Sequence, residues 1–218
     1  MGKWLGATPE HMTFEVRDRI AYITFNHPEK RNALSIEALR EFHAAVREAD
    51  DLKAARVIVI GGNGKDFCAG ADISGAPKPD QLGYDPKDYR AVENFDDDAW
   101  GVERRSELRL ALHQAHKPII AKVQGNCLAV GSDIALLCDF IIVANDARIG
   151  FPATRALGSP GNHMWLYHVG PQWAKRFLMT GDVIRGKFRT SLERPEPFPP
   201  GSPVPVSFIA AVISFEQP

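Results

Sequence analysis

The 218-residue sequence lacks the long apolar runs that mark membrane proteins. A bilayer-spanning helix needs about 18 or more apolar residues in succession, and no such run occurs, so no membrane partner is expected. The first 15 residues are mixed and polar, without the apolar stretch of a secretory signal peptide. These absences favour a soluble, cytoplasmic protein.

An excess of either charge is also lacking. The chain carries 26 lysines and arginines against 27 aspartates and glutamates, which gives a formal net charge of -1. This balance removes the electrostatic reason to expect nucleic acid as a partner. Cysteine is scarce, and Cys68, Cys127 and Cys138 lie in apolar segments without the even count of a disulfide framework. We predict that they are buried, reduced thiols.

Several catalytic motifs are absent as well. Residues 61–65 lack the spacing of a phosphate-binding loop, and no G-x-S-x-G elbow of a serine hydrolase occurs. His113 and His116 lie on a predicted helix without further ligands nearby, so no metal site is expected. Three aromatic residues on apolar helical segments are predicted to belong to the core: Trp165, Tyr167 and Trp173.

What the sequence does contain is an alternation of strand and helix patterns. Short apolar runs and period-two alternation predict strands at 13–26 (a strand or a hairpin), 57–60, 119–123 and 140–144. Apolar residues at helical spacing predict helices at 35–50, 102–116, 132–138 and 171–180. Strands that alternate with helices place the chain in the α/β class.

Two polar or proline-rich stretches interrupt this pattern. Residues 75–98 are polar and acidic, and we expect a surface loop with at most one short helix. Seven of the 16 prolines lie in the last 24 residues. Because proline cannot continue a helix, we expect residues 185–218 to be an extended or disordered tail, and residues 1–184 to form the core domain. A truncated or frame-shifted product is one interpretation of this change.

Two segments have the composition of a site that stabilises negative charge. Residues 66–73 follow a predicted strand and contain small residues, which leave a backbone N–H accessible to a ligand. Residues 125–133 connect a strand to a helix N-terminus, where unpaired N–H groups and the helix dipole favour negative charge. If N–H groups from both segments point at one carbonyl oxygen, they form an oxyanion hole.

Six short motifs follow one another between about residues 13 and 184: residues 32–35 (NALS), 67–73 (FCAGADI), 117–121 (KPIIA) with 123–125 (VQG), 135–139 (ALLCD), 160–161 (PG) and 178–182 (LMTGD). In these motifs and their order, the sequence resembles the crotonase, or enoyl-CoA hydratase/isomerase, family. The resemblance implies a spiral of repeated ββα units. It also implies assembly into homotrimers or hexamers, if the C-terminus permits.

The resemblance also assigns a site for an acyl-CoA thioester. It implies that the N–H groups of Ala71 and Val130 hold the thioester oxygen. The residues implied to line the CoA moiety, with the basic turn near its phosphates, are Lys30, Arg31, Ala33, Ala69, Ala71, Asp72, Ile73, Ser74 and Val130. An ordinary tight turn and a solvated charged turn are the alternative interpretations of these positions.

The acid/base positions depart from the family pattern. The family's hydratases place two glutamates around the attacking water, and these positions are occupied here by Asp133 and Ala153. Asp133 retains a carboxylate and is the expected general acid/base, although a first-turn aspartate stabilised by the helix dipole is the alternative. Alanine cannot transfer a proton, so Thr154, Arg155 and His163 are candidates to replace it.

The expected activity follows from this resemblance. We expect a lyase of fatty acid metabolism that adds water to a 2-enoyl-CoA, without a separate cofactor because CoA is part of the substrate. The family usually has glycines where Ala129 and Val130 stand, so weakened activity is expected. The alternatives are isomerisation or thioester hydrolysis through the same enolate, an impaired acyl-CoA-binding subunit, and a protein that shares the fold alone.

Overall fold

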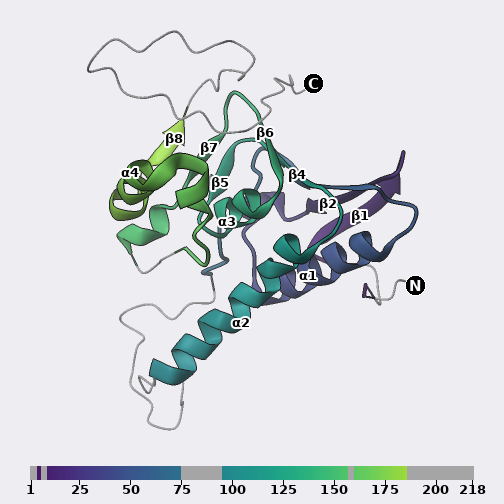
Figure 1. Ribbon diagram of the computed structural model, residues 1–218, viewed down its shortest axis with the longest axis horizontal. Coiled ribbons are helices and arrows are strands. Elements are labelled where there is room, and N and C mark those ends of the chain that lie inside the picture. The colour runs from purple at the N-terminus through teal and green to yellow at the C-terminus, as the bar shows by residue number, and fades with distance from the viewer. Residues whose placement is uncertain (1–3, 6–8, 75–94, 157–159, 186–218) are drawn as a thin grey trace.

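A computed structural model gives the structure of the chain and describes residues 4–5, 9–74, 95–156 and 160–185 (Figure 1). The predicted proline-rich tail from residue 186 onward lies outside the described residues, as do residues 75–94 of the predicted loop. The predictions made for these two segments therefore stay predictions.

The N-terminal hairpin and the helix after it form as predicted. β1 (Met12–Arg17) and β2 (Ile20–Phe25) pair antiparallel across a two-residue turn in which both φ angles are positive, as a tight hairpin requires. α1 (Ile36–Asp51) begins after Ser35, whose side chain accepts a hydrogen bond from the N–H of Ala38. This cap satisfies one of the unpaired N–H groups at the start of the helix.

The strands form two sheets. The larger sheet has the order β1-β2-β3-β4-β6, and every pair in it except β1-β2 is parallel. The smaller sheet has the order β5-β7-β8, with β5 and β7 parallel. The bounds of these strands are β3 (Val57–Gly62), β4 (Ile119–Val123), β5 (Asn126–Leu128), β6 (Phe140–Val143), β7 (Arg148–Gly150) and β8 (Val183–Arg185).

From β4 onward, each turn of the chain contributes one strand to each sheet and then a helix. β4, β5 and α3 (Val130–Leu137) form one such unit, and β6, β7 and α4 (Met164–Thr180) form the next. Cys68 makes a parallel bridge with Cys127, so the segment between β3 and α2 (Phe95–Gln114) begins the same series. The predicted spiral of ββα units is thereby confirmed, and Figure 1 shows the smaller sheet and α4 at the opposite end from the hairpin.

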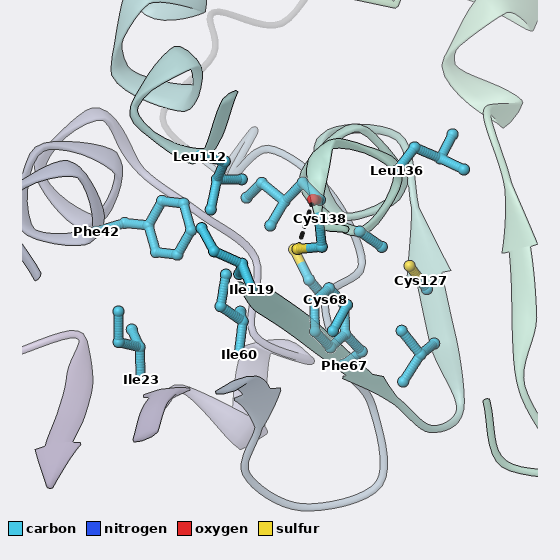
Figure 2. Close-up of a cluster of buried hydrophobic side chains, with 14 of the residues drawn as sticks. Ile23, Phe42, Ile60, Phe67, Cys68, Leu112, Ile119, Cys127, Leu136 and Cys138 are labelled. Carbon is cyan, nitrogen blue, oxygen red and sulfur yellow. Dashed lines mark hydrogen bonds between the residues drawn. The ribbon is translucent and has the colours of Figure 1, made fainter. Parts of the chain in front are cut away.

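The core lies between the helices and the larger sheet. Figure 2 shows Phe42 of α1 close to Ile119 of β4 and Leu112 of α2, and all three side chains are buried. The three cysteines are free and buried, as predicted. Burial raises the pKa of the Cys68 thiol to about 12, so this side chain is a neutral packing group.

Two helices differ from their predicted bounds. α2 begins at Phe95, so residues 95–98 are helical and do not belong to the predicted loop. α4 begins at Met164, ahead of the predicted start at Pro171, but Gly170 inside it has non-helical angles (φ 75°, ψ 166°). Pro171 therefore does start a second helical segment, as predicted.

The aromatic residues of α4 divide between the core and the surface. Trp165 is fully buried and Trp173 packs against the core, as predicted. The prediction for Tyr167 is wrong, because its side chain is 78% exposed. Two positions along a helix place it on a different face from Trp165. In the part of the chain that the structure describes, no helix has the length and apolar character needed to cross a membrane.

Candidate functional site

The two segments singled out in the sequence lie side by side. We call residues 66–74 the first segment and residues 125–133 the second segment. The N–H of Cys68 donates to the carbonyl of Asn126, and the N–H of Leu128 donates to the carbonyl of Cys68, both at 2.9 Å. A Cβ at Gly131 would lie only 2.6 Å from the Cys68 carbonyl oxygen. Glycine at this position therefore allows the start of α3 to pack directly on the first segment.

Among the described residues, neither predicted oxyanion donor gives its N–H to a backbone carbonyl. The N–H of Leu34 donates to Gly70 and the N–H of Asp72 donates to Leu34, so these bonds flank Ala71 on one side. In such a parallel bridge the N–H of the flanked residue points away from the partner. Val130 is the first residue of α3, and its N–H has no partner within the helix.

Each donor follows a residue with a positive φ angle. Gly70, before Ala71, has φ 121°, and Ala129, before Val130, has φ 48° and ψ -118°. Glycine adopts such angles without steric cost, whereas a residue with a Cβ is strained by roughly 1–3 kcal/mol. In the second segment, Ala129 therefore adopts a backbone conformation that glycine adopts more readily.

Eight of the residues predicted to line the CoA moiety lie close together, in exposed or half-buried positions. Lys30 Nζ lies 2.9 Å from Asp72 Oδ2 and 3.3 Å from Ser74 Oγ. The N–H of Ala69 donates to the carbonyl of Arg31 at 3.0 Å. The structure thus brings together all of these residues except Val130, which lies on the second segment: Lys30, Arg31, Ala33, Ala69, Ala71, Asp72, Ile73 and Ser74.

Asp133 occupies a different environment, because its side chain is only 1% exposed. Oδ2 accepts a hydrogen bond from the N–H of Gly161 at 3.1 Å and lies 3.7 Å from Nη1 of Arg109. Among the described residues, Oδ1 has no hydrogen-bond partner although it is buried. Burial raises the pKa of Asp133 from its ordinary 3.8 to about 6, even though Arg109 and the Gly161 N–H favour the charged form. A carboxyl group that titrates near neutral pH is suited to general acid/base catalysis.

No candidate replacement for the second glutamate faces this carboxyl group among the contacts of the described residues. Ala153 lies in the 3-10 helix Pro152–Arg155 and packs against the core. The Thr154 hydroxyl donates to the carbonyl of Phe151, and Arg155 contacts the carbonyl of Thr180. The side chains that the sequence offered as substitutes are therefore engaged elsewhere or, in the case of His163, exposed.

Sequence reasoning missed two groups of this site, Arg109 and the N–H of Gly161. Arg109 is one arginine on a predicted helix, and no motif surrounds it. The Pro160-Gly161 motif was a signal that could have identified the second group, but it does not tell which carboxylate the N–H contacts. Both contacts join residues at least 24 positions apart in the chain, so only the fold brings them together.

Two other features lie outside this site. A cavity of about 470 Å³ between the smaller sheet and α4 is lined in part by Arg148, Arg155 and Arg176, and by none of the residues predicted to hold the thioester oxygen, to line the CoA moiety or to act as the general acid/base. Among the described residues, one group could hold a metal ion, formed by Glu10, His11 and Glu41. The Glu41 carboxylate already accepts the N–H groups of Glu10 and His11, so this group is explained by the anchoring of the chain before β1.

Comparison with known proteins places this arrangement in a family. A sequence profile described as enoyl-CoA hydratase/isomerase matches residues 15–187. A crotonyl-CoA hydratase of Syntrophomonas wolfei is 33% identical over 179 residues, which cover 80% of this chain and 64% of the relative. A 2,3-dehydroadipyl-CoA hydratase of Escherichia coli is 30% identical over 171 residues, covering 77% of this chain and 61% of the relative.

The solved structures agree with the sequence relatives. The crystal structure of an enoyl-CoA hydratase from Mycobacterium smegmatis matches with a TM-score of 0.68 and 38% identity, covering 81% of this chain and 61% of that chain. The present chain thus spans about three fifths of the length of the relatives it matches. The match extends over most of its own residues and includes both segments of the site, and the chain therefore belongs to the enoyl-CoA hydratase/isomerase, or crotonase, family.

Proposed function

We propose that the chain is a lyase of the enoyl-CoA hydratase type, which adds water across the double bond of a 2-enoyl-CoA. The observation that carries this proposal is the buried Asp133 carboxyl, with an unpartnered Oδ1 and a pKa raised to about 6, three residues after Val130. The hydratases among the relatives support the same reaction class. Asp133 is the proposed catalytic residue.

The proposed mechanism uses the two segments for two tasks. The N–H groups of Ala71 and Val130 hold the thioester oxygen and stabilise the enolate, and one such donor is typically worth about 3 kcal/mol. As the water oxygen bonds to the β-carbon, Asp133 accepts a water proton and the double-bond electrons move to the thioester oxygen. The enolate then takes a proton from Asp133 at the α-carbon, which restores the carboxylate and the thioester.

The substrate supplies CoA, so the proposal includes no separate cofactor and no metal. Lys30 and Arg31 are exposed cations that would lie near the CoA phosphates, and Ala71 to Ser74 would line the CoA chain. Assembly into a homotrimer or hexamer is proposed from the family. A cytoplasmic location is proposed on the basis of the free, buried cysteines.

A second candidate function is an acyl-CoA-binding subunit with impaired catalysis. Ala153 favours it, because a methyl group cannot transfer the second proton that the family's hydratases handle with a glutamate. The alanine at position 129 favours it too, because a strained backbone there can misplace the N–H of Val130. This candidate predicts binding of CoA esters without turnover.

The test is hydration of crotonyl-CoA and of longer 2-enoyl-CoAs by the purified full chain. Loss of the enoyl thioester absorbance with a product one water heavier supports a hydratase. A shifted double bond without added water indicates an isomerase, and free CoA indicates a thioester hydrolase. Binding without any turnover, measured in parallel with a non-reactive acyl-CoA, would replace the hydratase by the binding subunit.

A further inference from the structure

Arg109 of α2 reaches the acid/base carboxyl of α3. Its side chain is 9% exposed, and Nη1 lies 3.7 Å from Asp133 Oδ2. Nη2 of the same guanidinium donates to Ser106 Oγ at 3.1 Å, one turn earlier on α2. A buried guanidinium needs a nearby negative charge, because desolvation of an uncompensated cation is costly. Asp133 supplies this charge from a different helix.

A glycine fixes the guanidinium against the same carboxylate. A Cβ at Gly161 would lie 2.0 Å from Arg109 Nη2, so the guanidinium packs directly on the backbone at this position. The N–H of Gly161 donates to Asp133 Oδ2. Three separate parts of the chain therefore meet at one carboxylate oxygen: α2, the start of α3 and the loop before α4.

The two oxygens of Asp133 are treated differently by their surroundings. Oδ2 contacts both the Arg109 guanidinium and the Gly161 N–H, whereas Oδ1 has no partner among the described residues. One oxygen is thus held in place and the other is left to exchange a proton. We propose that Arg109 is a positioning residue, which holds Oδ2 of Asp133 so that Oδ1 faces the reacting water. This inference rests on the proposed function.

The other groups near Asp133 cannot replace Arg109. α3 packs against α2, β5 and α4. On β5, Cys127 is a buried thiol whose pKa is raised well above its usual range by burial, so it is neutral. On α4, His168 Nε2 lies 2.9 Å from the Leu136 carbonyl oxygen, and Asn162 before α4 contacts the Asp133 carbonyl. Arg109 is the charged group that lowers the pKa of Asp133 among the described residues.

Loss of Arg109 should change both the acidity and the reactivity of Asp133. An opposite charge at this distance lowers the pKa of a carboxyl group by roughly one unit or more, so Arg109→Met should raise the pKa of Asp133 by about that amount. The acid limb of kcat/KM should move to higher pH by the same amount, because the ionised carboxylate accepts the water proton. Arg109→Lys, which keeps the charge without the planar fork, should restore part of the shift.

The experiment is a ¹³C NMR titration of aspartate carboxyl groups in the full chain, with Asp133→Asn used for assignment, alongside pH profiles of hydration. Arg40→Met, which removes an exposed cation of α1, is the matched control and should leave the Asp133 titration unchanged. If Arg109→Met folds and the Asp133 titration does not move, the proposal is overturned. If this variant does not fold, Arg109→Gln carries the same test.

The titration also separates this proposal from the proposed function. A shifted Asp133 titration in Arg109→Met, in a chain that shows no hydration of any 2-enoyl-CoA, would support the contact and refute the lyase. Hydration by the wild-type chain, with the same pH profile in the wild type and in Arg109→Met, would support the lyase and refute the positioning role. A purely structural role for Arg109 would lower kcat/KM equally at every pH.

Discussion

The two segments of the site carry the same kinds of group in opposite surroundings. The first segment has a half-buried aspartate, Asp72, with a side chain 18% exposed, and the second has a buried one, Asp133, with a side chain 1% exposed. Hydrogen bonds from Ser74, together with Lys30, hold the pKa of Asp72 well below its usual range. Burial raises that of Asp133 to about 6. The same side chain is therefore a permanent anion in one segment and a titrating group in the other.

The backbones of the two segments also differ, at the residue before each predicted donor. The residue before each predicted N–H donor has a positive φ, but it is Gly70 in the first segment and Ala129 in the second. In the first segment a glycine occupies the positive-φ position, so the backbone is not strained there. In the second segment an alanine occupies it, and the strained backbone lies close in the chain to the buried carboxyl group of Asp133. Strain and raised pKa values gather where catalysis needs them, which favours the second segment as the place where proton transfer occurs.

The largest expected effect is the loss of hydration in Asp133→Asn. A positioned acid/base group contributes about 10²- to 10⁴-fold to the rate, so kcat should fall by that factor, while an acyl-CoA should bind as before. Enoyl thioester absorbance measures the rate, and calorimetry with a non-reactive acyl-CoA measures binding. Asp146→Asn, on an exposed loop, is the matched control and should keep full activity. Undiminished hydration in Asp133→Asn would show that Asp133 is not the acid/base group, and that the second segment has no special role in proton transfer.

The second prediction concerns stability as a function of pH. The pKa of Asp133 is raised in the folded state, so its contribution to stability is fully present below its ordinary value of 3.8 and is lost as pH rises through about 6. The unfolding free energy of the wild type, relative to that of Asp133→Asn, should therefore fall by about 2 kcal/mol between about pH 4.5 and about pH 7.5. Urea unfolding of both proteins at several pH values measures this difference.

Asp72→Asn is the informative comparison for this experiment. The pKa of Asp72 is lowered in the folded state, so its contribution is present above its ordinary pKa and is lost as pH falls. The unfolding free energy of the wild type, relative to that of Asp72→Asn, should therefore rise with pH, and only under acidic conditions. The same sign in both pairs would contradict the assignment of opposite environments.

The third prediction exchanges the residues before the two donors. Ala129→Gly should raise the unfolding free energy by about 1 kcal/mol, because relief of the positive-φ strain exceeds the entropy that glycine adds to the unfolded chain. Gly70→Ala should lower it by roughly 1–3 kcal/mol, since it introduces the same strain and brings a Cβ to 3.1 Å from that of Ala129. Urea midpoints at one pH measure both. Destabilisation by Ala129→Gly would show that the second segment is not strained.

The sequence predicted the elements whose patterns are local and long. The hairpin, α1 and β4 follow from periodicity, capping and an apolar run, all of which act over a few neighbouring residues. β5 and β7 were not predicted as strands because each has three residues, and three residues show no periodicity. Their partners lie more than 20 residues away, so tertiary pairing defines them.

The site divides in the same way between what is local and what is not. The positions of Ala71, Val130 and Asp133 follow from motifs that can be read along the chain. The contact of Asp133 with Arg109 does not, because it joins two helices that only the fold brings together. The conformation of Ala129 could not be predicted from the sequence either, because alanine rarely adopts a positive φ angle.

The smallest expected effect belongs to the exposed pair of the first segment. Lys30→Met removes the cation 2.9 Å from Asp72 Oδ2, and with it the proposed attraction to CoA phosphates. Exposed ion pairs are weak, so the dissociation constant of an acyl-CoA should rise only about two- to five-fold, and kcat should not change. The ratio between wild type and variant should shrink as salt is added, because salt screens exposed charges. Lys53→Met, another exposed cation, should show neither effect. A fall in kcat that salt does not alter would instead place Lys30 at the reaction centre and bring the two segments closer in role.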